Sequence, residues 1–356
     1  MKILYIILIM GILEYAGPGF GAEKIDVVTT LSTYADIARK VGGEKVEVKY
    51  LVEGDQDAHF VRPKPSYALI LNKADLFVTT GLDLELWVPT LLDMSKNPRI
   101  RSGQPGYVAA YDGIDLLDKP TTFSRSEGDL HIYGNPHITT NPLNFKIIAE
   151  NIVIGLEKVS PENSDYFRQN LKEFQNQIDN RVFGEELVSL MGGALLTKLA
   201  LSGQLIDFLS EKEYKGQRMI SYLGGWLKEG MIFRDKKIVA YHKNWAYFEK
   251  LFGIQVIGYV EPKPGIPPSP RHVEQLVSEM RKHDVKVLLA ANYFDEGKIK
   301  TICDKVGAIP VIVPLYVGGA PGTEDVFQLV DYWVSNLKRA FEQVSQQTEN
   351  LMMRSE

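Results

Sequence analysis

The sequence predicts an α/β protein built from two similar lobes of mostly parallel sheet, joined by a long helix. Short β-rich runs alternate with helical patterns from residue 24 onward, and a long helical stretch interrupts this alternation near the middle of the chain. The length of 356 residues is a third indication, because it allows about two domains. With 45% hydrophobic and 24% charged residues, the composition is that of a globular protein.

Residues 1–22 have the pattern of a secretory signal peptide. Lys2 precedes an apolar run over residues 3–13, and the small residues that follow suit cleavage after Gly21 or Ala22. A membrane span needs about 20 apolar residues, and this run is shorter. No cysteine lies at the cleavage site to accept a lipid. We therefore expect a mature protein that begins near Glu23, is not a lipoprotein, and works in a bacterial periplasm or outside the cell.

The N-terminal lobe is predicted over residues 23–142. Strands are expected at 25–30, 46–52, 75–80 and 107–111, and helices at 34–41, 65–73 and 84–94. Pro65 and Ser66 are typical of a helix start. A polar loop over residues 118–141 ends the lobe.

Two linking helices are predicted within residues 143–189, at 145–159 and 163–187. The second helix carries apolar side chains at three- and four-residue spacing, namely Tyr166, Leu171, Phe174 and Ile178. A helix of about 25 residues is about 37 Å long, close to the diameter of a small domain. It is therefore expected to be a rigid strut between the lobes.

The C-terminal lobe is predicted over residues 233–346. Strands are expected at 237–241, 255–260, 285–290 and 309–313, and helices at 245–251, 270–282, 297–306 and 324–346. Residues 190–232 precede this lobe and contain two Gly-Gly pairs and two short apolar helical patterns. This segment is an insertion without a predicted role.

Charge and cysteine content limit the possible functions. Forty basic residues against 45 acidic ones give a net charge of -5, which disfavours binding to nucleic acid through phosphate neutralisation. The single cysteine, Cys303, excludes an internal disulfide and any site with several thiolates. A metal site in this chain must therefore use imidazole and carboxylate groups.

Three of the six histidines lie where ligands bind in open α/β sheets, at the carboxyl ends of strands or at a loop edge. His59 follows the second predicted strand, His137 precedes the first linking helix, and His242 follows the strand at 237–241. Three imidazoles drawn from both lobes match zinc coordination. The alternative is that each is a solitary histidine, on the surface or hydrogen-bonded.

The other three histidines fit surface positions better. His272 and His283 lie on or at the end of the charged helix 270–282, which favours a solvated face. His131 lies six residues before His137 in the same loop. It is either an accessory metal ligand or a solvated loop residue.

Six motifs occur in order over nearly all of the mature chain: Asp57 to Ser66 (DAHFVRPKPS), Leu71 to Gly81 (LNKADLFVTTG), Asn135 to His137 (NPH), Ala240 to Gly253 (AYHKNWAYFEKLFG), Glu261 to Pro270 (EPKPGIPPSP) and Val313 to Gly319 (VPLYVGG). Together they resemble one family, the helix-hinged metal-binding proteins that serve ABC importers for zinc and manganese. Each motif is weak alone, and their order and spacing make the resemblance specific.

The resemblance implies that His59, His137 and His242 are metal ligands. Three neutral imidazoles favour zinc over manganese, for which family members replace the third histidine with a carboxylate. Many members have an aspartate in the last strand, where this chain has Val313. Glu261 is the candidate replacement as fourth ligand, unless it caps the proline-rich loop or is solvated. Asn141 stands where the family usually has aspartate, and either residue can cap a helix.

The expected function is that of a periplasmic solute-binding protein and not of an enzyme. It would capture a divalent transition metal, zinc rather than manganese, in the cleft between the lobes and deliver it to the membrane permease of an ABC importer, as a monomer. A zinc hydrolase with three histidines and an open position is the alternative, although the chain has no HExxH or GxSxG motif. An adhesin-type binding module without a metal is a further alternative.

Overall fold

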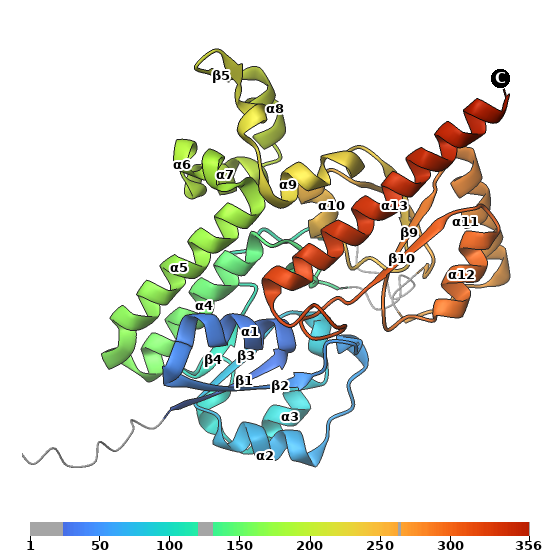
Figure 1. Ribbon diagram of the computed structural model, residues 1–356. Coiled ribbons are helices and arrows are strands. Elements are labelled where there is room, and N and C mark those ends of the chain that lie inside the picture. Colours follow the sequence, from blue (N-terminus) through green and yellow to red (C-terminus); the bar gives the residue numbers. More distant parts are fainter. Residues whose placement is uncertain (1–23, 120–130, 263–264, 356) are drawn as a thin grey trace, which may run out of the picture.

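A computed structural model describes residues 24–119, 131–262 and 265–355, and it contains two four-stranded parallel sheets, one below the other in Figure 1. The strand order is β2-β1-β3-β4 in the first sheet and β10-β9-β7-β8 in the second. The predicted α/β fold with two parallel-sheet lobes is therefore confirmed. The predicted signal peptide, residues 1–22, lies outside the described residues.

The first sheet and its helices follow the predicted order. Its strands are β1 (Ile25–Leu31), β2 (Val46–Val52), β3 (Leu76–Thr79) and β4 (Tyr107–Ala109), and its helices are α1 (Ser32–Gly42), α2 (Pro65–Lys73) and α3 (Val88–Ser95). Every residue of β3 is buried, as expected for an inner strand of a parallel sheet that is covered on both faces. The helix predicted over 84–94 was placed too early, because a separate 3₁₀ turn at Asp83–Glu85 precedes α3.

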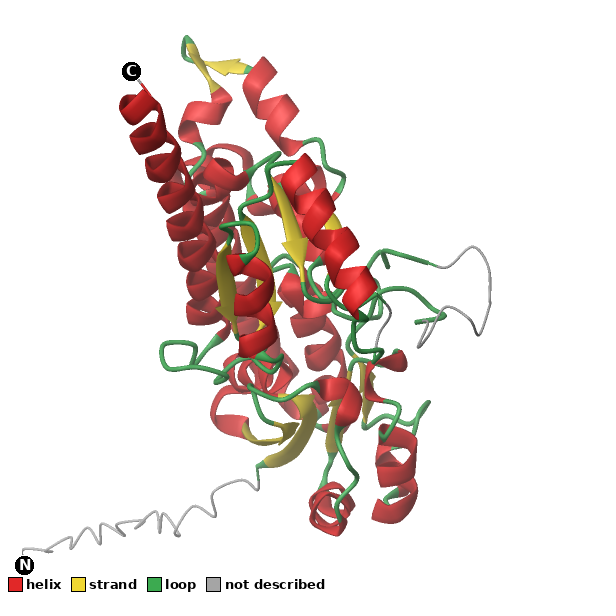
Figure 2. Ribbon diagram, turned by 90° about the vertical axis from the view of Figure 1, so that its right-hand side faces the viewer, coloured by secondary structure: helices red, strands yellow, loops and turns green. Residues whose placement is uncertain are grey.

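The second sheet has the same kind of construction. Its strands are β7 (Lys237–Ala240), β8 (Gln255–Tyr259), β9 (Val287–Ala291) and β10 (Ile309–Val313), and its helices are α10 (Ala246–Phe252), α11 (Pro270–Lys282), α12 (Glu296–Asp304) and α13 (Val326–Ser355). Figure 2 shows α13 as the long helix along one side of this lobe; it continues past the predicted end at residue 346. Among the described residues, no helix combines the length and apolar character of a membrane span.

The linking helices are α4 (Asn144–Val159) and α5 (Ser164–Phe183), followed by the short α6 (Glu185–Met191). The prediction of one helix over 163–187 was wrong at its end, because Gly184 has a φ of 85° and breaks the helix. Helix α5 packs against α1 and against α9 (Gly225–Glu229). It also reaches α13 of the C-terminal lobe, where the Phe174 and Phe327 ring centroids lie 5.9 Å apart.

The segment over residues 190–232 forms small helices and one hairpin. These are α7 (Gly193–Leu201), α8 (Leu205–Glu211), the strands β5 (Glu213–Tyr214) and β6 (Gln217–Arg218), and α9. In Figure 1, α6 to α8 and the hairpin stand away from both sheets, whereas α9 lies beside α13.

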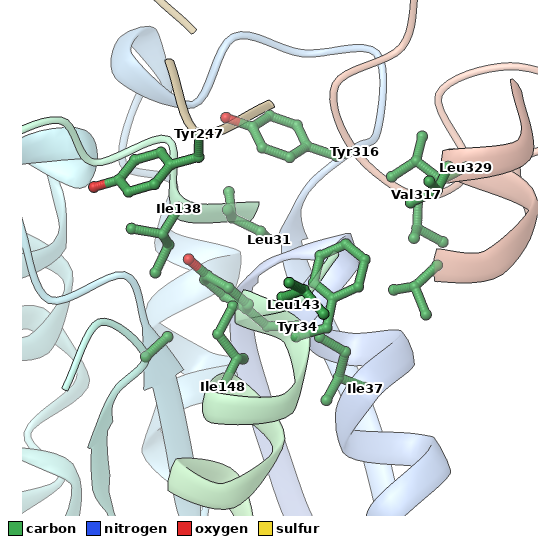
Figure 3. Close-up of a cluster of buried hydrophobic side chains, with 14 of the residues drawn as sticks. Leu31, Tyr34, Ile37, Ile138, Leu143, Ile148, Tyr247, Tyr316, Val317 and Leu329 are labelled. Carbon is green, nitrogen blue, oxygen red and sulfur yellow. The ribbon is translucent and has the colours of Figure 1, made fainter. Parts of the chain in front are cut away.

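The described residues form two hydrophobic core clusters, and the larger one extends between the lobes. Figure 3 shows Tyr34 of α1 beside Leu143 and Ile148 of the α4 region, with Val317 and Leu329 from the C-terminal lobe nearby. Two hydrogen bonds cross the same boundary: Ser32 Oγ donates to the Val317 carbonyl at 2.7 Å, and the Val317 amide donates to Thr33 Oγ1 at 3.2 Å. The strand ends of the two lobes are thus held in a fixed relation.

Candidate metal centre

Three histidines far apart in the sequence meet between the lobes. His59 lies in a one-turn helix, Ala58–Phe60, which follows β2; His242 follows β7; and His137 directly precedes the 3₁₀ turn Ile138–Thr140. Each offers one ring nitrogen, and these three atoms all lie within 4.8 Å of one another. The ring centroids are 5.1 to 5.8 Å apart. Two residues that precede the linking helices, His59 and His137, and one from the C-terminal lobe, His242, therefore face a common point.

A carboxylate holds the His59 ring. Asp57 caps the short helix, and its Oδ1 accepts hydrogen bonds from the His59 amide at 3.0 Å and from the ring Nδ1 at 2.7 Å. Burial favours a higher pKa of Asp57, but these hydrogen bonds outweigh it and the pKa is lowered, so the residue stays ionised. Trp87 Nε1 anchors the same turn by donating to the Ala58 carbonyl at 2.8 Å. With Nδ1 engaged, Nε2 of His59 is the nitrogen that remains to bind a metal.

His242 has the same arrangement with Glu261. Strands β7 and β8 are neighbours in the sheet, so the residues after their carboxyl ends lie side by side. The Nδ1 atom of His242 lies 2.6 Å from Glu261 Oε2, and the Glu261 amide donates to the Tyr241 carbonyl at 2.8 Å. The Glu261 carboxylate thus contacts Nδ1 of His242, the ring nitrogen that faces away from the other histidines. Glu261 is not one of the three residues whose ligand atoms converge.

His137 differs from the other two because its ring has no hydrogen-bond partner. It is only 3% exposed, and within the described ranges neither Nδ1 nor Nε2 is paired. Burial, followed by the neighbouring histidines, lowers its pKa well below the usual value, which keeps the imidazole neutral. A buried polar atom without a partner is costly. A metal ion at the common point would bind one of the two unpaired nitrogens, so the residues present fit such an ion.

Backbone contacts fix His137 against the segment that carries His242. The Asn135 side chain accepts from the His137 amide at 3.0 Å and donates to the Lys243 carbonyl at 2.9 Å. Thr140 Oγ1 donates to the Asn244 carbonyl at 3.2 Å. Asn135 and Asp57 each stand two residues before a histidine within the sequence motifs, and this short spacing is the signal in the sequence that points to their role.

The remaining histidines separate into two groups. His131 Nε2 lies 3.4 Å from His59 Nε2, so this residue belongs to the cluster and not to an open loop surface. Burial, and then the neighbouring His59 and His242, lower the pKa of His131 to about 3. His272 donates to the Tyr259 carbonyl at 2.9 Å, and His283 pairs with Glu279 at 3.4 Å. Both lie in the α11 region away from the other four, but they are half-buried and not freely solvated as predicted.

No carboxylate replaces the family aspartate at the end of β10. Val313 is fully buried there, as part of the hydrophobic core. In the described part of the chain, the group of converging ligand atoms therefore contains three imidazole nitrogens and no oxygen. Such a donor set suits zinc, copper, nickel or iron better than manganese or magnesium.

Comparison with known proteins identifies one family. The family model described as the periplasmic component A of a zinc-uptake complex matches residues 27–182 and 217–340. These two ranges contain the three converging histidines, His131 and Glu261. The unmatched stretch between them covers α6 to α8 and most of the hairpin.

Related proteins include carriers of different metals. A manganese ABC transporter substrate-binding lipoprotein of Streptococcus pneumoniae is 24% identical, covering 83% of this chain and 80% of its own. A high-affinity zinc uptake system protein of Bacillus subtilis is 22% identical, covering 80% and 76%.

Solved structures share the fold. A crystal structure of ZnuA has a TM-score of 0.64 at 20% identity, covering 89% of this chain and 99% of that one. A manganese-bound periplasmic metal-binding protein of Candidatus Liberibacter asiaticus, an S38A mutant, has a TM-score of 0.62 at 19% identity, covering 89% and 100%.

Proposed function

We propose that the ion this chain carries is zinc. The premise is that the chain belongs to the family of the periplasmic component A of zinc-uptake complexes. The chain is a metal-binding protein of an ABC importer and not an enzyme, so the hydrolase alternative is set aside. Its partner is the membrane permease of that importer. The relatives do not decide the metal, because their names include both manganese and zinc.

The cluster of three imidazoles supports zinc. Neutral imidazole is a good ligand for zinc, whereas manganese prefers carboxylate, carbonyl and water oxygens. His59, His137 and His242 bring nitrogens within 4.8 Å of one another, and the His137 ring has no partner in the described residues. We assign these three residues as zinc ligands.

Two carboxylates orient the histidine rings. An oxygen of Asp57 lies 2.7 Å from Nδ1 of His59, and an oxygen of Glu261 lies 2.6 Å from Nδ1 of His242. A carboxylate in this position fixes the ring and makes its other nitrogen more basic. We therefore assign Glu261 the role of orienting His242, in place of the fourth-ligand role expected from the sequence.

Calorimetric titration of the metal-free protein with zinc chloride tests this function. We expect tight binding of one zinc ion per chain and much weaker binding of manganese chloride. Replacing His59 or His242 with alanine removes one imidazole, and we expect each change to lower zinc affinity by at least about tenfold. His283→Ala is the matched control, because His283 pairs with Glu279 away from the cluster.

Unchanged zinc binding in both His59→Ala and His242→Ala would refute the assignment. A wild-type protein whose thermal stability does not respond to zinc would instead favour the adhesin alternative, because a tightly bound ion must stabilise the folded state. Tighter binding of manganese than of zinc would overturn the choice of metal.

We also propose that the mature protein is a monomer in the periplasm, released by cleavage after Gly21 or Ala22. The single cysteine of the chain, Cys303, is buried in α12. The streptococcal relatives are named lipoproteins, so this point needs its own test. Native mass spectrometry of the secreted protein distinguishes a free monomer from a lipidated or oligomeric form.

A further inference from the structure

His131 faces the zinc site from the loop that precedes His137. Its ring centroid lies 5.3 Å from that of His59 and 5.8 Å from that of His137, next to the group of three ring nitrogens that lie within 4.8 Å of one another. The side chain is half-buried. It reaches the cluster although 72 residues separate it from His59.

The distance between the two nearest ring nitrogens matches shared coordination. His59 Nε2 and His131 Nε2 lie 3.4 Å apart. Two nitrogens bound at about 2.0–2.1 Å to one tetrahedral zinc ion are separated by about 3.3 Å. The Nδ1 atom of His59 is engaged by Asp57, so the nitrogen that faces His131 is the one that is free to bind the metal.

The backbone around His131 is tied to both lobes. The Ile132 amide donates to Asp83 Oδ2 at 3.2 Å, in the turn that precedes α3. The Gly134 amide donates to the His131 carbonyl at 3.1 Å, and the Asn135 amide donates to the Leu117 carbonyl at 2.7 Å. Asn135 is also bonded to Lys243 of the C-terminal lobe. The hydrogen bonds to Asp83, Leu117 and Lys243 thus hold the imidazole in position.

We propose that His131 is the fourth zinc ligand of this protein, in place of the carboxylate that is missing at Val313. The inference rests on the proposed function and gives it a specific donor set of four imidazoles. A metal centre with four neutral nitrogens keeps its affinity for zinc and offers manganese no protein oxygen. His131 therefore adds to the preference for zinc that His59, His137 and His242 already give.

X-ray absorption at the zinc K-edge measures the donor set directly. In the zinc-loaded wild-type protein we expect four imidazoles. In His131→Ala we expect three imidazoles and one oxygen donor, which lacks the outer-shell scattering of an imidazole ring. Titration with zinc chloride should show an affinity about 10- to 100-fold lower in His131→Ala, whereas the affinity for manganese chloride should change by less than about threefold. The control His283→Ala should match the wild type in all three measurements.

A carboxylate at the same position provides a second test. His131→Asp supplies an oxygen where the wild type supplies a nitrogen, so we expect the ratio of zinc to manganese affinity to fall by at least about tenfold. This variant also guards against misfolding of His131→Ala, and the thermal unfolding of both metal-free variants verifies the fold.

The possible failures are distinguishable. If the wild-type protein binds no zinc, the proposed function itself is wrong. If the wild type binds zinc through three imidazoles, or if His131→Ala keeps the wild-type affinity and spectrum, only the fourth-ligand inference is wrong and the three-histidine site remains.

Discussion

At the residue scale, the site depends on which nitrogen of each ring is already engaged. Asp57 and Glu261 lie on the Nδ1 atoms of His59 and His242, so both rings present Nε2 to the same point. His137 has neither nitrogen paired in the described residues and is held instead through its backbone by Asn135. The energetic cost of burying an unpaired imidazole is offset only when a metal binds, so this residue couples folding to the ion.

The two carboxylates are expected to affect zinc affinity without binding zinc themselves. Replacing Glu261 with alanine frees the His242 ring and leaves its Nδ1 without an acceptor, so we expect zinc affinity to fall by about 10- to 100-fold. Glu261→Gln keeps an acceptor oxygen but loses the charge, and its loss should be smaller. X-ray absorption should show the same number of imidazoles in both variants as in the wild type.

The exposed Glu53, which precedes the His59 loop, supplies the control Glu53→Gln, for which we expect wild-type affinity. If Glu261→Ala instead removes an oxygen from the metal's coordination shell, Glu261 is a direct ligand and the orienting role is wrong. An unchanged affinity in Glu261→Ala would contradict both roles.

The sequence alone predicts the three histidine ligands, but not the carboxylates that orient their rings or the approach of His131. His59 and His242 follow strand runs that periodicity identifies, and the carboxyl ends of parallel strands meet at one edge. The approach of His131 to His59 depends on how a long loop folds back, and no local pattern encodes that. The role of Glu261 depends on β7 and β8 being adjacent in the sheet, which is a matter of strand order.

At the element scale, boundaries were predicted well where the chain carries a strong local signal. Helices α2 and α11 begin with Pro65 and Pro270, and Ser269 caps α11 by accepting from the His272 amide. The end of α5 was not predicted, because a single glycine in a helical sequence pattern does not show that another part of the backbone packs against it. Gly184 lies against Gly224, which is 40 positions later in the sequence.

Gly184 and Gly192 form a matched pair that tests this contact. Both have positive φ, 85° and 79°, with similar ψ of 144° and 137°. A Cβ at Gly184 would lie 2.6 Å from the Gly224 Cα, whereas nothing lies within 4 Å of a Cβ at Gly192. Both alanine variants pay about 1–3 kcal/mol of backbone strain. We expect Gly184→Ala to lose at least about 1 kcal/mol more in the free energy of unfolding.

Urea denaturation of the metal-free protein measures this difference. Equal losses in Gly184→Ala and Gly192→Ala would mean that the close approach of α5 and α9 does not contribute to stability. Zinc affinity should be unchanged in Gly192→Ala, because its position lies outside the family-matched ranges and away from the histidines.

At the scale of the whole molecule, the two lobes are joined by more than the linking helices. Ser32 and Thr33 at the start of α1 bond to Val317, and Asp36 Oδ2 accepts from the Val326 amide at 3.0 Å, at the start of α13. Asp36 is buried at this junction, 3.8 Å from Lys40 Nζ. Strand patterns predicted both lobes, but the shared core of Figure 3 comes from residues in different lobes that no local pattern relates.

Asp36 makes the stability of this junction depend on pH. Burial raises its pKa from 3.8 to about 6, with Lys40 and the Val326 amide acting in the opposite direction. Because the folded state holds this proton more tightly than the unfolded state, the contribution of Asp36 to stability is fully present below about pH 4 and is lost as the pH rises through about 6. Over that interval the loss is about 2 kcal/mol.

Asp36→Asn removes this titration while it keeps an acceptor for the Val326 amide. The free energy of unfolding of the variant minus that of the wild type should therefore increase by about 2 kcal/mol from about pH 4 to about pH 7. Taking the difference between the two proteins cancels the titration of the buried histidines, which both share. Asp207→Asn, at an exposed position on α8, controls for the loss of a carboxylate. A difference that stays flat across this range, or that falls, would show that the Asp36 carboxyl does not hold its proton more tightly at the junction between the lobes.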